Sequence, residues 1–257
     1  MGFRVGWLSG ILVAICLWAP SGLGNQPSVP RCSVQTVHAA HFHGKVLALV
    51  GPPGAGKGTL SPMLQERLGL VHIATGDLFR EEVARGTALG KSLEPFLKEG
   101  KFIPQEHVNA VLAKRLAQPD VAAGVILDGF PRNLSQLPDL EKLLASLGKR
   151  LDAVIHLDVP EELSVQWLGG RRICPQCKAG YQVTFRPPHR EGVCDRCNHP
   201  LVTRGDDREA IIRRRFAVYR TETVPLIDEL RRRGLVHTFS GNTRPESLVE
   251  TVIDSLL

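Results

Sequence analysis

The chain has 257 residues, of which 43% are hydrophobic and 23% are charged, and this composition is typical of globular proteins with ample material for a core. The formal net charge of +6 and a pI near 9.2 favour anionic partners without separating nucleotides, nucleic acid and anionic lipid. Of the six cysteines, Cys16 and Cys32 lie near the start and four form one tight group with metal-ligand spacing. That distribution argues against a disulfide framework.

The first 44 residues are expected to be a leader and linker. Arg4 is followed by an apolar run over residues 5–18 and by a Gly22-x-Gly24 pair, which is the layout of a secretory signal with a small-residue cleavage site. The run is too short for a comfortable membrane span. A start site assigned too far upstream would leave the same pattern, so both interpretations stay open, and the first structured residue is expected at Lys45.

From Lys45 onward, short β-rich runs alternate with helical stretches. The predicted strands cover residues 45–51, 70–75, 124–130, 152–160 and 235–240, and two helical patterns cover residues 107–117 and 134–148. Near-continuous apolar strands separated by helices predict an α/β fold, with a parallel sheet covered by helices on both faces. Two insertions interrupt this alternation, a helical one at 75–103 and a cysteine-bearing one at 170–207. Both are natural candidates for moving substrate flaps.

The stretch GPPGAGKGT follows the first predicted strand and precedes a helix. Gly51, Gly56 and Lys57 match the phosphate-loop pattern G-x-x-x-x-G-K in the context that supports such a match. The glycines allow the backbone N–H groups to point at anionic oxygens, and Lys57 adds a mobile cation for the outer phosphates. The loop therefore indicates a nucleoside triphosphate, although by itself it does not separate a kinase from a nucleotide switch.

The residue after this lysine is Gly58, where most loops of this type carry a hydroxyl group that ligates Mg²⁺. The metal must then be held by Thr59, by water or by a carboxylate elsewhere. Asp128, which comes late in the predicted strand 124–130, is suited to that role. We therefore expect Mg²⁺ to be less firmly tied to this protein than to most phosphate loops.

Several motifs occur in a fixed order along the chain: GKGT, ATGDLFR at 74–80, LDGFPR at 127–132, and then DVPEEL, GRR and TRGDD. Together they span the chain from residue 45 to the C-terminus. With these motifs the chain resembles the adenylate kinase family of nucleoside monophosphate kinases, in its long form with a zinc-binding lid.

The resemblance implies a phosphate-loop α/β core with two substrate-binding insertions. The implied core covers residues 45–74, 104–169 and 208–257, the monophosphate-binding insertion covers 75–103, and the lid covers 170–207. The implied activity is reversible phosphoryl transfer from MgATP to AMP, which gives two ADP and serves purine nucleotide homeostasis.

The resemblance also implies residues for two nucleotide sites. It places the donor ATP on Gly54, Ala55, Gly56, Lys57, Gly58, Thr59, Trp167, Arg171 and Arg244. It places the acceptor AMP on Thr75, Arg80, Lys101, Phe102, Ile103, Gly129, Phe130, Pro131, Arg132, Gln136, Arg204 and Arg215. The implied catalytic residues are Lys57, Asp128, Arg132, Arg171, Arg204 and Arg215. Arginines suit this chemistry because in-line transfer spreads negative charge over equatorial oxygens, which cations stabilise.

Two positions bear on the choice of nucleotide. Gln136 favours AMP, because the resemblance places Asn there in UMP/CMP kinases. Trp167 stands where the family usually has an arginine that packs against the donor base, and a tryptophan can also stack on a base. A GTP:AMP phosphotransferase therefore remains an alternative to ATP:AMP transfer.

The four grouped cysteines have the spacing C-x2-C-x16-C-x2-C and are Cys174, Cys177, Cys194 and Cys197. Two turn-forming pairs at this spacing converge on a tetrahedral site, and four thiolates favour a structural Zn²⁺ without an open catalytic position. Such pairs also occur in zinc ribbons that bind nucleic acid, so a nucleotide-dependent nucleic-acid-binding protein is the alternative from another class. Arg171 and Arg204 flank the group on both sides, which favours a lid.

The expected partners are the small molecules ATP, AMP and ADP, without nucleic acid, and a monomer is the expected state. The cytoplasm is the expected location, because both nucleotides are abundant inside cells and four thiolates are safest in a reducing compartment. If the leader is a real signal, the protein would instead be exported or tethered at a membrane.

Overall fold

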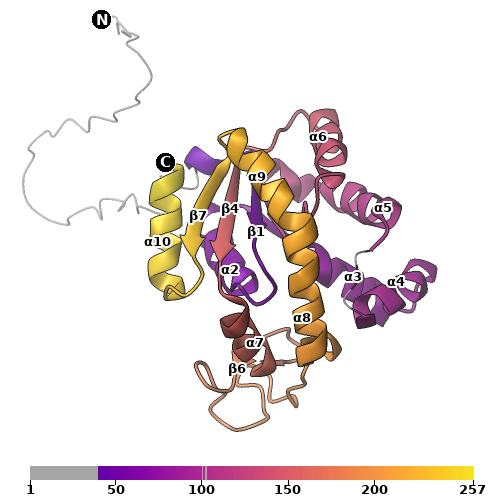
Figure 1. Ribbon diagram of the computed structural model, residues 1–257, viewed down its shortest axis with the longest axis vertical. Coiled ribbons are helices and arrows are strands. Elements are labelled where there is room, and N and C mark those ends of the chain that lie inside the picture. The colour runs from indigo at the N-terminus through magenta and orange to yellow at the C-terminus, as the bar shows by residue number, and fades with distance from the viewer. Residues whose placement is uncertain (1–39, 100, 102) are drawn as a thin grey trace, which may run out of the picture. The chain divides into compact units, whose positions relative to one another are not determined.

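Five parallel strands form the central sheet of the computed structural model, which describes residues 40–99, 101 and 103–257 (Figure 1). Their order across the sheet is β2-β3-β1-β4-β7. The strands are β1 (Val46–Val50), β2 (Val71–Ala74), β3 (Val125–Asp128), β4 (Ala153–Asp158) and β7 (Val236–Ser240). Because each pairing is parallel, the carboxyl ends of all five strands lie at one end of the sheet. The predicted α/β fold with a parallel sheet is confirmed.

Strand β1 illustrates why these apolar runs form buried strands. Val46, Ala48 and Val50 belong to a first core cluster, while Leu47 and Leu49 belong to a second. The two sets alternate because successive side chains of a strand point to opposite faces of the sheet. All five side chains are almost fully buried, so β1 requires cover on both faces.

Helices supply that cover (Figure 1). The first core cluster packs between the sheet and α5 (Gln105–Leu116), α6 (Gln136–Ser146) and α9 (Val224–Arg232). The second packs between the opposite face and the helices α2 (Lys57–Leu68) and α10 (Pro245–Leu256). A short 3-10 turn, η1 (Pro119–Ala123), leads into β3.

The helical insertion consists of α3 (Thr75–Ala84) and α4 (Ala88–Glu99), which pack against each other. Gly90 allows their close approach, because a Cβ atom at this position would lie 2.0 Å from the carbonyl oxygen of Glu82. A larger residue at position 90 would push the two helices apart.

The cysteine-bearing insertion is a small β unit that follows α7 (Glu161–Gly169). Its strands β5 (Arg171–Ile173) and β6 (Gly180–Gln182) pair antiparallel. The 3-10 turn η2 (Gly205–Asp207) then leads into α8 (Glu209–Val218), and a π-helical turn, η3 (Tyr219–Thr223), joins α8 to α9. The apolar cluster of this unit is small and contains buried Cys174, Tyr181 and Cys194.

Folded structure starts before Lys45, in contrast to the expectation from the sequence. Residues 40–42 are helical, and Phe42 is 3% exposed within the second core cluster. The N–H of Gly44 donates a hydrogen bond to the carbonyl of Ala123 at 2.9 Å. Residues 1–39 of the predicted leader and linker (1–44), with Cys16 and Cys32, lie outside the described residues. Within the part of the chain that is described, no helix is long and apolar enough to cross a membrane.

Candidate active site

The phosphate loop joins β1 to α2, and the side chain of its lysine bonds back to the loop. Gly51 lies so close to β4 that a Cβ atom would be 2.4 Å from the carbonyl oxygen of Leu157, and Gly56 has a φ of 87°. Both conditions require glycine. The Nζ of Lys57 donates hydrogen bonds to the carbonyls of Gly51 at 2.7 Å and Pro52 at 2.8 Å. Lys57 therefore lies over the loop, within reach of an anion bound there.

The pKa of Lys57 is lowered from its ordinary value of 10.5 to about 7. Burial is the largest cause, the carboxylate of Asp128 opposes the shift, and the guanidinium of Arg132 adds to it. Nearby phosphate would favour the charged amine and so raise this pKa again. The protonation state of Lys57 is therefore sensitive to the ligand.

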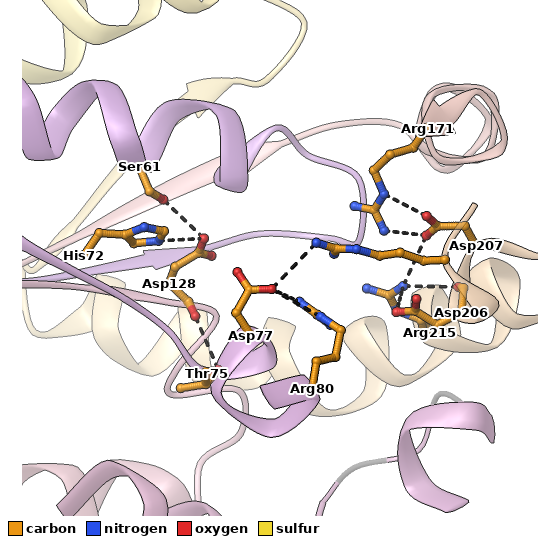
Figure 2. A network of polar contacts seen from close by, with 11 residues as sticks. Ser61, His72, Thr75, Asp77, Arg80, Asp128, Arg171, Asp206, Asp207 and Arg215 are labelled. Carbon is orange, nitrogen blue, oxygen red and sulfur yellow. Dashed lines mark hydrogen bonds and ion pairs between the residues drawn. The ribbon is translucent and has the colours of Figure 1, made fainter. Parts of the chain in front are cut away.

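Asp128 ends β3 and faces the start of α2 (Figure 2). The hydroxyl of Ser61 donates to its Oδ2 at 3.2 Å, and Nε2 of His72 lies 3.2 Å from the same oxygen. The hydroxyl of Thr75 meets the main-chain carbonyls of Asp128 at 3.3 Å and Gly129 at 3.2 Å. The predicted carboxylate is thus held in place at the carboxyl end of the sheet, where oxygen ligands suit Mg²⁺.

Arg132 is held at three points in the loop after β3. Its Nε donates to the Gly129 carbonyl at 2.6 Å, its backbone N–H donates to Oε1 of Gln136 at 2.7 Å, and its carbonyl accepts from Oγ1 of Thr223 at 2.7 Å. Burial among surrounding protein atoms and the neighbouring charge of Arg215 lower the pKa of Arg132 to about 10, so it remains cationic at neutral pH.

Gln136, for which a base contact is predicted, also makes a hydrogen bond within the protein. It is 3% exposed, and its Oε1 holds the backbone of Arg132. Its amide nitrogen, which that bond does not engage, would be the group that contacts a base.

Asp77 contacts two arginines that belong to different insertions, and Figure 2 shows its pair with Arg80. Its Oδ1 accepts a hydrogen bond from Arg80 on α3 at 2.5 Å and lies 3.6 Å from the guanidinium of Arg204. Desolvation is the largest single influence on the pKa of Asp77 and would raise it, but the charge and hydrogen bond of Arg80 together with the charge of Arg204 outweigh it and hold the pKa below its ordinary value. Both arginines were predicted site residues, whereas Asp77 was missed. Its place in the TGD motif was the available signal.

Asp206 and Asp207 hold two further predicted arginines. The Nε of Arg171 donates to Oδ2 of Asp207 at 2.7 Å, and a second guanidinium nitrogen donates to the other oxygen, so the pair is bidentate. Arg215 donates to Oδ2 of Asp206 at 3.1 Å and lies 3.9 Å from Asp207. The side chain of Asp207 is fully buried. Neither carboxylate was predicted, although both belong to the TRGDD segment.

The cations of this region act on one another. Burial and then the charges of Arg80 and Arg171 lower the pKa of Arg204 to about 10. Burial also lowers the pKa of Arg215, with Arg171 adding to the effect. So many cations at short range favour a ligand that carries several negative charges. The arrangement can bind and stabilise transferring phosphoryl groups.

Other predicted acceptor residues lie near the ends of β2, β3 and α4. The buried members of this set are Thr75, Ile103, Gly129, Phe130 and Pro131. Lys101 is exposed and pairs with Glu99 at 2.5 Å. Phe102 lies outside the described residues, so its predicted contact with the base stays a prediction.

The remaining predicted donor residues surround the phosphate loop. Gly58 and Thr59 are exposed at the start of α2. Trp167 on α7 is half-buried against the second core cluster, which includes Ala55 of the loop.

The loop between β7 and α10 also approaches the phosphate loop. A Cβ atom at Gly241 would lie 2.8 Å from the carbonyl oxygen of Ala55. Arg244, three residues farther on, is exposed and caps the start of α10. Helix α7, which carries Trp167, also approaches the loop, since a Cβ atom at Gly54 would lie 2.9 Å from the side chain of Leu168. The contact of Trp167 and Arg244 with the donor base stays a prediction.

The four cysteines converge as their spacing predicts. All four Sγ atoms lie within 4.8 Å of one another, and none of the four is in a disulfide. Cys174 and Cys197 are 3.4 Å apart at sulfur, and Cys177 and Cys194 are 3.5 Å apart. The phenol oxygen of Tyr181 lies 3.4 Å from the sulfur of Cys194. This group could hold a metal ion.

Two matching turns present these sulfurs. In the first, the N–H of Cys174 donates to the carbonyl of Ala179 at 2.9 Å, and in the second the N–H of Cys194 donates to that of His199 at 2.9 Å. The residue after each pair has a left-handed backbone, with φ values of 61° and 57°. The repetition shows that both pairs are built in the same way to direct their sulfurs inward.

Comparisons with known proteins agree with this geometry. A sequence model of the adenylate kinase family matches residues 49–235. The adenylate kinase of Moorella thermoacetica is 46% identical over 196 residues, which are 76% of this chain and 90% of the relative. That of Streptomyces avermitilis is 46% identical over 211 residues (82% and 96%). That of Archaeoglobus fulgidus is 41% identical over 213 residues (82% and 98%). Because the family model matches most of the chain and the relatives are this similar, the chain belongs to the adenylate kinase family.

Proposed function

We propose that the protein catalyses reversible transfer of a phosphoryl group from MgATP to AMP, giving two ADP. The observation that carries this proposal is the close grouping of the phosphate loop with Asp128 and with five arginines from the core and both insertions, namely Arg80, Arg132, Arg171, Arg204 and Arg215. Such a set can bind two phosphate chains and stabilise the charge between them. The relatives that cover most of the chain are named adenylate kinase, which supports the same activity.

The chemistry needs positioning and charge more than proton transfer. The attacking phosphate oxygen of AMP is already anionic, so no general base is required. Negative charge spreads over the equatorial oxygens during transfer, and cations fixed beforehand at that point lower the barrier most. Lys57, Arg132, Arg171, Arg204 and Arg215 are the proposed cations.

The ion pairs of the structure suggest how nucleotides are received. Arg80 and Arg204 share Asp77, and Arg171 is paired with Asp207. A phosphate offers the same bidentate geometry to a guanidinium as a carboxylate does. We infer that nucleotide phosphates take over guanidinium hydrogen bonds from these carboxylates, so the arginines are positioned before the substrates arrive.

The proposed acceptor site lies on α3 and the loop after β3, and the proposed donor site lies on the phosphate loop. Arg80 and Arg132 would bind the AMP phosphate, with Gln136 near the base. Trp167 and Arg244 would flank the donor base. Mg²⁺, when bound with ATP, neutralises phosphate charge and orients the triphosphate of ATP. Asp128 is the carboxylate that we propose to hold its hydration shell.

We also propose that the four-cysteine group binds a structural Zn²⁺. Sulfur ligands at mutual distances of 3.4–3.5 Å for two pairs suit a small tetrahedral ion. A unit with so small an apolar cluster gains stability from a bound metal. Residues 170–207 would then close over the donor as one lid, while residues 75–103 close over AMP.

The location and state of the protein follow as lesser proposals. Four thiolates persist best in a reducing compartment, which supports the cytoplasm, and a site assembled within one chain supports a monomer. Fractionation of cells and light scattering of the purified protein test these two points.

The experiment for the proposed function is a matrix of initial velocities with ATP, GTP, CTP and UTP against AMP, CMP, UMP and GMP. Turnover with ATP and AMP in the absence of nucleic acid is the expected result. A preference for GTP would instead identify Trp167 as the donor determinant, and replacement W167R should then restore ATP. No turnover with any pair would refute phosphoryl transfer between nucleotides.

A further inference from the structure

The π-helical turn η3 separates α8 from α9 in what would otherwise be one long helix. The N–H of Val224 donates to the carbonyl of Tyr219, five residues back. Pro225 follows, and in a regular α-helix its ring would clash with the carbonyl of residue 221. The wider turn gives the ring room and redirects the side chains around it. Turns of this kind occur frequently at functional sites.

Thr223, the last residue of this turn, reaches the active-site loop. Its hydroxyl donates a hydrogen bond of 2.7 Å to the main-chain carbonyl of Arg132, which is 91 residues away in sequence. Thr223 is 6% exposed, so water does not readily replace this bond. The backbone N–H of Arg132 is held by Gln136. Two side chains, rather than a strand or helix, therefore fix the backbone of Arg132.

The other end of the turn is anchored in the sheet. The phenol of Tyr219 lies 3.0 Å from Nε2 of His156 on β4, and Nδ1 of His156 lies 3.3 Å from Oγ1 of Thr238 on β7. The rings of Tyr219 and Phe216 also pack edge to face, with centroids 5.9 Å apart. These contacts give Thr223 a rigid base from which to support Arg132.

The support is needed because Arg132 has a cationic neighbour. Arg215 lies on α8, four residues before the turn, and its charge is among those that act on Arg132. Two guanidinium groups repel each other, and Asp206, which pairs with Arg215 at 3.1 Å, opposes that effect on Arg132 less strongly than Arg215 exerts it. The segment 215–223 thus carries one of these cations and, through Thr223, holds the backbone of the other.

We propose that Thr223 is a positioning residue for phosphoryl transfer, which holds Arg132 against the repulsion of Arg215 and in place for the acceptor phosphate. The proposal rests on the proposed function, since it takes Arg132 to bind the phosphate of AMP. Thr223 does not touch a nucleotide in this account. Its effect should therefore fall on AMP and on the transfer step rather than on ATP binding.

The test compares Thr223→Val, which keeps the shape and loses the donor, with Thr223→Ser, which keeps the donor. Thr221→Val is the matched control, because Thr221 belongs to the same turn but is exposed and bonds locally to the carbonyl of Val218 at 3.3 Å. In T223V we expect kcat/KM for AMP to fall about 10- to 100-fold, as small misplacements of a catalytic group do. The KM for ATP should change less than about twofold. T223S should recover most of the loss, and T221V should match the unaltered chain.

A double-mutant cycle separates positioning from a general loss of structure. If Thr223 acts through Arg132, adding T223V to R132A should reduce kcat/KM for AMP no further than R132A alone. Multiplicative losses in the double variant would overturn the proposal. So would an unchanged T223V, or a T223S that remains as impaired as T223V. If the unaltered chain itself fails to turn over ATP and AMP, the proposed function is refuted and the role of Thr223 falls with it.

Discussion

Lys57 should take up a proton when a nucleotide binds. Its pKa is about 7 in this structure because burial and nearby arginines disfavour the charged amine. Bound phosphates favour that charge, and a return toward the ordinary value of 10.5 leaves Lys57 fully protonated in the complex. In the protein without nucleotide, a pKa of about 7 makes Lys57 about 10% protonated at pH 8, about 50% at pH 7 and about 90% at pH 6. Binding should therefore take up about 0.9, 0.5 and 0.1 proton at these three pH values.

The assay is calorimetry with a bisubstrate analogue in buffers of different ionisation enthalpy at pH 6, 7 and 8. K57R is the control, because it keeps a cation in the loop whose pKa stays above the tested range. Protons exchanged by other groups or by the ligand occur in both proteins and cancel in the difference. Equal uptake by the unaltered chain and K57R at pH 8 would refute the argument that Lys57 is largely neutral before binding.

The same shift has a consequence for stability with a definite sign. Between pH 7 and 10.5 the unfolded chain keeps the Lys57 proton that the folded chain has released. The contribution of Lys57 to the free energy of unfolding therefore becomes more favourable as pH rises through this window. A K57R variant should lack this rise, and chemical denaturation of both proteins at pH 7 and 9.5 would measure it. A rise of the same size in K57R would contradict the assignment.

Two further predictions concern the lid. Asp207→Asn should lower the melting temperature by about 4–8 °C and reduce kcat, because Arg171 loses its buried carboxylate at a cost of about 2 kcal/mol. Asp120→Asn is the control. Its bidentate pair with Arg115 is exposed and should contribute under about 1 kcal/mol. Equal losses in the two variants would contradict the dependence on burial. Removal of zinc by a chelator, or Cys194→Ser, should unfold the lid locally and raise the KM for ATP while the far-ultraviolet circular dichroism of the core persists. Metal analysis that finds no zinc in the purified chain would refute the metal site.

The elements best predicted from the sequence were those whose cause is local. The strand β1 is apolar at every position because both of its faces are buried, and such a run is visible without any knowledge of its neighbours. The phosphate loop can likewise be predicted from the sequence, since Gly51 and Gly56 occupy positions where any side chain would clash or strain the backbone. The spacing of the cysteine pairs alone predicts their turns. In each case one short segment contains both the pattern and its physical reason.

What the sequence did not reveal depends on contacts between distant segments. Phe42 stands in a histidine-rich stretch that looks like linker, yet it fills a place in the second core cluster. Thr221 and Thr223 stand two residues apart, and the sequence does not tell them apart. The π turn directs the hydroxyl of Thr223 inward and leaves Thr221 exposed. No periodicity or motif distinguishes these cases. They are decided by which backbone groups the folded chain brings opposite each side chain.

The carboxylates that the sequence analysis missed bear most directly on the proposed chemistry, because we infer that they limit how tightly the site holds its substrates. Without Asp77 and Asp207, the arginines they hold would repel one another and the folded protein would bear that cost. When they are present, the binding free energy of a phosphate is only the difference between the hydrogen bonds it forms and those it displaces. The exposed Asp77 should release its arginines to a phosphate more easily than the buried Asp207 releases Arg171. A reversible transfer that must release two ADP is served by such moderate affinity, since uniform tight binding would lower KM without raising kcat. We therefore expect the acidic residues next to the arginine motifs to moderate nucleotide affinity rather than to be incidental surface charge.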